Sequence, residues 1–194
     1  MKPTLTQLKN LPNILKIAPQ SEFRDTIPCG ALTEVSGPLG GGKTEWVLSF
    51  LRENRDLTAA WVESDFTLYP CTLEESRIAL SRVLFVQPTP ARVLATVLTI
   101  VRSQVYPAVV LGAAGLGDEI RALDELSLRK LQLAALKSKT ILFLLQTTPS
   151  PNHWAISRRI RVSRNPRTGA PEVFNLKQPS TTQPPSKGEI AWPA

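Results

Sequence analysis

Residues 37–44 read Gly-Pro-Leu-Gly-Gly-Gly-Lys-Thr and satisfy the phosphate-loop pattern G-x-x-x-x-G-K-[ST] at every required position. Glycine lets backbone N–H groups crowd around phosphate oxygens, and the start of a following helix adds positive potential. The Lys43 ammonium can reach terminal phosphates, and the Thr44 hydroxyl can ligate Mg²⁺ through a bound nucleotide. This pattern predicts a nucleotide site formed by Gly37, Gly40, Gly41, Gly42, Lys43 and Thr44.

The elements around this loop are those that the motif needs. Residues 32–36 before it predict a short strand, and apolar positions between 46 and 51 predict a helix over 43–54. The alternative is a glycine-rich turn with an unrelated lysine. Strand, glycine loop and helix in this order favour the phosphate loop.

Strands and helices alternate along the rest of the chain, which has 194 residues, 42% of them hydrophobic. Apolar runs predict strands at 59–63, 83–86, 108–111 and 140–146. Helices are predicted at 72–81, opened by a Thr72–Glu75 capping box, at 89–105 and at 118–139. Apolar strands joined by helical crossovers indicate an α/β fold with a mainly parallel sheet and helices on both faces.

A different pattern follows the last predicted helix and strand. Residues 159–163 and 172–176 alternate around an Asn-Pro-Arg-Thr-Gly turn, which predicts a C-terminal β-hairpin. Residues 178–194 are rich in Pro, Ser, Thr and Gln and are expected to be disordered. The expected organisation is a lead-in segment at 1–27, a core at 28–177 and a Pro-rich tail at 178–194.

The net charge of +7 is concentrated near the C-terminus, where residues 151–194 hold seven basic and two acidic side chains. Such a balance favours a polyanionic partner over uniform solubilising charge. We expect DNA phosphates to contact the hairpin arginines, the alternative being a solvated strand face; these arginines are Arg158, Arg159, Arg161, Arg164 and Arg167.

The sequence predicts a cytoplasmic protein without a membrane segment. No apolar run approaches the roughly 18 residues of a membrane span, and polar residues interrupt the first 13 positions where a signal peptide would be apolar. The two cysteines, Cys29 and Cys71, provide neither a disulfide framework nor metal-ligand spacing.

The order of these motifs resembles the RecA-type phosphate-loop ATPases over about residues 25–177. In that family the strand after the loop helix ends in acidic residues before a proline, as in Ala60-Trp-Val-Glu63-Ser-Asp65-Phe-Thr-Leu-Tyr-Pro70. The resemblance implies ATP and Mg²⁺ as cofactors and places the water-polarising acid at Asp65, with Glu63 as a second candidate. It also implies a γ-phosphate-sensing role for Gln146. From the residues alone, Asp65 could instead cap a turn and Gln146 could be a polar strand end.

Within this branch the chain resembles the ImuA group, which shares the lead Gly30-Ala-Leu-Thr-Glu34 into the loop. ImuA proteins belong to bacterial damage-induced mutagenesis cassettes. The resemblance implies a Y-family polymerase-like protein and an error-prone polymerase as partners. We also expect single-stranded DNA and RecA as partners, and an oligomer is compatible with the sequence.

Two departures separate this chain from an active RecA. Gly112 stands where the family has the Walker B aspartate that holds the Mg²⁺ water shell. The segment after Gln146 is short, whereas the corresponding loop of RecA is long and binds DNA. We therefore expect an accessory protein with weak or no ATP turnover. The alternative is a DNA-stimulated ATPase of the RecA/KaiC type; a small-molecule kinase is disfavoured because no arginine-bearing lid follows the core.

Overall fold

The computed structural model describes residues 14–16, 26–65, 67–112, 123–150, 154–169 and 171–177. The predicted tail at 178–194 and most of the lead-in at 1–27 lie outside these residues. Within the lead-in, β1 (Ile14–Lys16) pairs antiparallel with β2 (Thr26–Pro28), whose last residue begins the predicted core.

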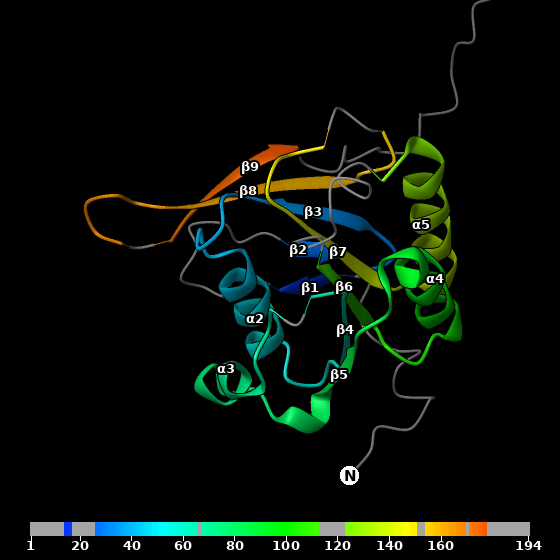
Figure 1. The fold of residues 1–194 in the computed structure, drawn as a ribbon, viewed down its shortest axis with the longest axis horizontal. Coiled ribbons are helices and arrows are strands. Elements are labelled where there is room, and N and C mark those ends of the chain that lie inside the picture. Colours follow the sequence, from blue (N-terminus) through cyan, green and yellow to red (C-terminus); the bar gives the residue numbers. More distant parts are fainter. Residues whose placement is uncertain are drawn as a thin grey trace, which may run out of the picture.

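A seven-stranded sheet forms the centre of the protein, with the strand order β5-β4-β6-β7-β3-β8-β9 (Figure 1). Its strands are β3 (Leu32–Ser36), β4 (Ala59–Glu63), β5 (Val83–Val86), β6 (Ala108–Gly112), β7 (Ile141–Gln146), β8 (Arg158–Arg164) and β9 (Pro171–Lys177). All neighbours run parallel except β8 and β9, which form the antiparallel hairpin. The predicted α/β class, mainly parallel sheet and C-terminal hairpin are confirmed.

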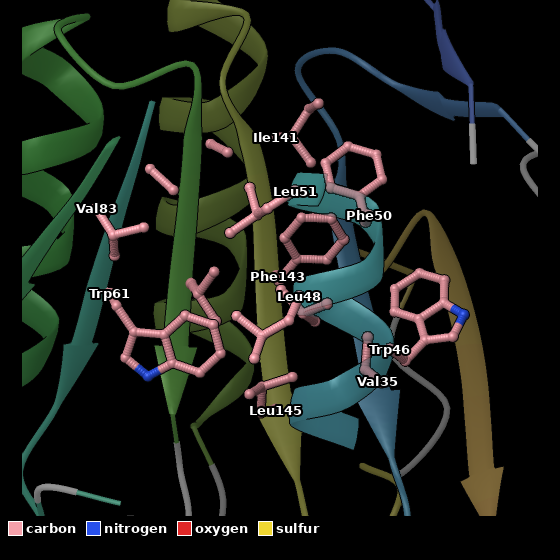
Figure 2. Close-up of a cluster of buried hydrophobic side chains, with 14 of the residues drawn as sticks. Val35, Trp46, Leu48, Phe50, Leu51, Trp61, Val83, Ile141, Phe143 and Leu145 are labelled. Atoms are coloured by element: carbon pink, nitrogen blue, oxygen red, sulfur yellow. The ribbon is translucent and has the colours of Figure 1, made fainter. Parts of the chain in front are cut away.

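Helices cover both faces of this sheet, because its interior strands are apolar on both sides (Figure 1). They are α2 (Lys43–Glu53), α3 (Pro70–Glu75), α4 (Val93–Ser103) and α5 (Glu125–Ser138), with short 3₁₀ turns at Leu80–Arg82 and Pro90–Arg92. On one face α2 packs Phe50 against Phe143 of β7, with ring centroids 5.1 Å apart (Figure 2). On the other face α4 and α5 contribute Val97, Val101, Leu128 and Leu131 to a second core.

The helix predicted over 72–81 is wrong in both its start and its end. It begins at Pro70, whose fixed φ suits the first helical position, so the Thr72–Glu75 pair opens no helix. It ends after Glu75 because Arg77 adopts a left-handed φ of 59° and the Ile78 N–H bonds back to the Leu73 carbonyl at 2.8 Å. The turn buries Ile78 in the core.

The helix predicted over 118–139 begins later than expected within the part of the chain that the structure describes. Asp124 caps α5 by accepting a hydrogen bond from the Ser127 N–H at 2.9 Å, and residues 113–122 lie outside the described ranges. The helix predicted over 89–105 opens with a 3₁₀ turn at Pro90 and continues as α4.

Candidate functional site

The glycine loop joins the C-terminal end of β3 to the N-terminus of α2, in the middle of the sheet. β3 lies between β7 and β8, and the Gly37 N–H donates to the Gln146 carbonyl at the end of β7 at 3.1 Å. The loop lies at the carboxyl ends of the parallel strands, which is the usual position of ligand sites in open α/β folds. The structure thus places the predicted loop where a phosphate could bind.

Close approach of the backbone explains Gly37, and a left-handed backbone conformation explains Gly42. A Cβ atom at Gly37 would lie 2.0 Å from the Val162 carbonyl oxygen of β8, so no side chain fits there. Gly42 caps α2 with a left-handed φ of 98°, and its backbone lies against the Val162 and Pro171 side chains of the hairpin. The loop is therefore packed between the core and the hairpin.

Lys43 begins α2 and turns back into the loop. Its ammonium donates to the carbonyls of Gly37 at 2.6 Å and Pro38 at 2.7 Å, and its side chain is buried. Burial lowers the pKa of this ammonium below its usual value of 10.5. The half-buried Thr44 follows in the first helical turn. The loop thus brings a lysine and a threonine to the N-terminus of α2, the residue types that a nucleotide phosphate with Mg²⁺ requires.

Gly112, where the resemblance leads us to expect an aspartate, lies directly beside Glu63 in the β4–β6 register. A Cβ at Gly112 would stand 2.9 Å from Glu63 Oε2 and 3.1 Å from Glu63 Cβ. The Glu63 side chain and a Cβ at Gly112 lie on the face of the sheet that α2 covers. Trp61 and Val110, two positions earlier in each strand, belong to the hydrophobic core on that face. The Glu63 carboxylate therefore occupies the space where an aspartate side chain at 112 would begin.

Four hydrogen bonds hold this carboxylate. Oε1 accepts from the N–H groups of Thr67 at 2.7 Å and Leu68 at 2.9 Å, while Oε2 accepts from Trp61 Nε1 at 3.1 Å and Thr67 Oγ1 at 2.7 Å. Glu63 thus fixes the turn after β4 and is 3% exposed. Asp65, the first candidate for polarising water, is exposed in that turn.

Gln146, the predicted phosphate sensor, is buried in a polar network beneath the loop. Its amide nitrogen faces Glu34 and lies within hydrogen-bond distance of Glu34 Oε1 at 3.1 Å, the Thr148 carbonyl at 3.1 Å and Ser150 Oγ at 2.8 Å, and its two hydrogens are shared among these acceptors. Glu34 also accepts from the Ser150 N–H at 2.5 Å and pairs with Arg159, Nε to Oε2, at 3.0 Å. The network joins β3, β7, the following loop and β8.

The five hairpin arginines do not share one environment. Arg158 is 3% and Arg159 is 7% exposed, and Arg158 donates to the Asn175 side chain at 3.1 Å. Arg161, Arg164 and Arg167 are exposed. Only these last three are accessible to a phosphate backbone on this surface.

Three residues of these networks were missed by sequence reasoning as site residues. They are Glu34, Trp61 and Thr67, which fix Gln146 and Glu63. A charged residue inside an apolar central strand was the available signal for Glu34, because such a charge needs a buried partner.

Across the described ranges, no group of three or more His, Cys, Asp or Glu side chains could hold a metal ion. No helix among the same residues is long and apolar enough to cross a membrane.

Comparison with solved structures identifies the fold. The crystal structure of a RadB recombinase superposes with a TM-score of 0.61 at 19% sequence identity, covering 77% of this chain and 82% of the recombinase chain. At this identity the likeness concerns the fold, which is RecA-like. No protein-family model and no curated protein sequence matches the chain.

Proposed function

We propose that this protein is a RecA-like accessory factor of the DNA damage response that binds ATP with Mg²⁺, contacts single-stranded DNA and supports translesion synthesis with weak or no hydrolysis. The RecA-like fold and the resemblance to the ImuA group support this proposal together. Its partners would be a Y-family polymerase-like protein, an error-prone polymerase and RecA.

One observation carries the claim of binding without efficient turnover. The phosphate loop is intact, with Lys43 turned into it, whereas β6 ends at Gly112 and its side-chain space is filled by Glu63. The oxygens of Glu63 already accept four hydrogen bonds, so this acid is engaged in holding the turn after β4. The position that holds the Mg²⁺ water shell in active relatives thus lacks a free carboxylate.

Affinity and turnover measured on the same preparation test this function. We expect the full chain to bind ATP with Mg²⁺, and Lys43→Ala to lose that binding. Phosphate release should stay below roughly 1 s⁻¹ with and without single-stranded DNA, which is the low end of ordinary enzyme rates. Faster release with DNA would favour the DNA-stimulated ATPase, and absence of ATP binding would remove the nucleotide site.

Capture of partners tests the accessory role separately. The full chain and a chain ending at Lys177 can be compared for retention of purified polymerase-like proteins from a damage-inducible cassette. Ile190 and Trp192 are the apolar residues near the end of the Pro-rich segment, and we expect them to anchor a partner. Equal retention by both chains would move the anchor to the core, and no retention would contradict the accessory role.

A further inference from the structure

Arg164, near the exposed end of the hairpin, hydrogen-bonds to the phosphate loop. Its Nε donates to the Gly40 carbonyl in the loop at 2.9 Å, and its Nη2 donates to Glu45 Oε2 at 2.8 Å. Its Nη1 donates to the Gly169 carbonyl in the hairpin turn at 2.9 Å. One guanidinium therefore connects the loop, the first turn of α2 and the hairpin.

The surrounding backbone makes this connection stiff. Val162, two residues before Arg164 on β8, approaches the loop so closely that a Cβ at Gly37 would lie 2.0 Å from its carbonyl oxygen, and its side chain lies 3.5 Å from where a Cβ at Gly42 would be. The strand β8 therefore packs against the loop on both sides of Gly40. Gly40 itself has a left-handed φ of 70°, and no atom lies within 4 Å of the position that a Cβ would take there. Arg164 supplies a polar contact at the part of the loop that packing does not hold.

Electrostatics explain why the contact between Arg164 and Glu45 would favour nucleotide binding. Glu45 stands two residues after Lys43, at the helix N-terminus where phosphate charge would gather. A carboxylate is favourable at an empty helix N-terminus but repels an anion that binds there. Arg164 faces Glu45 and offsets that repulsion.

The Arg164 side chain is also 46% exposed, on the same hairpin as the exposed Arg161 and Arg167. A guanidinium prefers a phosphate that it can contact through two N–H groups. A phosphate backbone lying along this hairpin would compete with Gly40 and Glu45 for Arg164.

We propose that Arg164 is a positioning residue of the phosphate loop, and that a polyanion on the hairpin lowers nucleotide affinity by drawing this arginine away. The inference rests on the proposed function, because it requires ATP at the loop. It states that ATP and the polyanion each weaken the binding of the other. By linkage, ATP must weaken polyanion binding by the same factor.

Titration of ATP with Mg²⁺ into four full-length proteins, the parent and three variants, tests the positioning role. Arg164→Gln is expected to weaken ATP binding about fivefold, as the loss of one favourable charge and one charged hydrogen bond near the phosphates implies. Adding Glu45→Gln to that variant should restore most of the affinity, because the unmasked carboxylate is gone. Arg102→Gln, at the exposed end of α4, should stay within about twofold of the parent.

A second readout needs no nucleotide. Amide hydrogen exchange of residues 37–44 should be faster in Arg164→Gln than in the parent, and unchanged in Arg102→Gln, because only the first change removes a bond to the loop. Equal ATP affinity and equal exchange in the two variants would overturn the positioning role. If the parent itself binds no ATP, the proposed function fails, and exchange still reports on Arg164.

Competition tests the regulatory part. Saturating oligo(dT) should lower the ATP affinity of the parent, and this effect should vanish in Arg164→Gln. An unchanged or increased ATP affinity of the parent in oligo(dT) would show that the hairpin does not oppose nucleotide binding. That result leaves the proposed function intact, since ATP and DNA would each still bind.

Discussion

Gly112 leaves no room for a side chain because the carboxylate of Glu63, on the neighbouring strand, fills its place, with Oε2 2.9 Å from where a Cβ would be. The glycine on β6 and the buried acid on β4 are therefore one structural arrangement. An acid introduced at Gly112 must first displace Glu63 from the donors of Trp61, Thr67 and Leu68.

We expect Gly112→Ala to lower the free energy of unfolding by about 1–3 kcal/mol, the range for overpacking a buried site. In a Glu63→Ala background the same change should cost less than about 1 kcal/mol, because the clashing atoms beyond Cβ are removed. Urea denaturation of the parent, both single variants and the double variant gives the coupling energy. If the effects of Gly112→Ala and Glu63→Ala on stability simply added, the steric conflict between these two positions would be contradicted.

The ion pair of Glu34 and Arg159 should be costly to break from one side. Their side chains are 1% and 8% exposed, so Arg159→Met leaves a buried carboxylate without its cation and is expected to cost about 3–5 kcal/mol. The double variant with Glu34→Gln should recover part of this loss. Arg161→Met, two residues along β8 and exposed, is the matched control and should change stability by about 0.5 kcal/mol or less.

DNA binding by the hairpin should depend on its exposed arginines. Replacing Arg161 and Arg167 by Gln should reduce the slope of log affinity against log salt by about 1.4 for single-stranded DNA, at roughly 0.7 per phosphate contact. The exposed Arg102 at the end of α4 provides a control substitution that should leave the slope unchanged. A slope that is equal in all variants would place the DNA contact away from this hairpin.

The lowered pKa of Lys43 predicts a dependence of stability on pH. Burial places the folded-state pKa below the unfolded value of 10.5, so the unfolded chain binds this proton more tightly. The protonated Lys43 ammonium thus lowers the free energy of unfolding at neutral pH. This penalty disappears as pH rises through the folded-state pKa toward 10.5. Relative to Lys43→Met, the parent should gain stability between pH 7 and about pH 10 in urea denaturation. A constant difference between the two proteins would contradict the pKa shift.

Local sequence signals determined the phosphate loop, the class of fold and most of the strands. The strands at 32–36, 59–63 and 83–86 have the predicted bounds, because a residue that favours turns follows each strand within two positions, namely Gly37, Ser64 and Pro88. The hairpin was predictable for the same reason, since alternation and its Asn-Pro-Arg-Thr-Gly turn lie within one short segment.

Tertiary structure alone decided which of the candidate residues face solvent and which face each other. Alternation places Arg159 and Arg161 on one face of β8, yet Arg159 is buried against Glu34 while Arg161 is exposed. The difference depends on the β3–β8 register, which sets Arg159 beside Glu34 and Arg161 beside Ser36, and on the segment after β7 that brings Ser150 to Glu34. The contact of Glu63 with Gly112 likewise arises from the pairing of β4 with β6. Such contacts join residues far apart in the sequence, so no local pattern contains them.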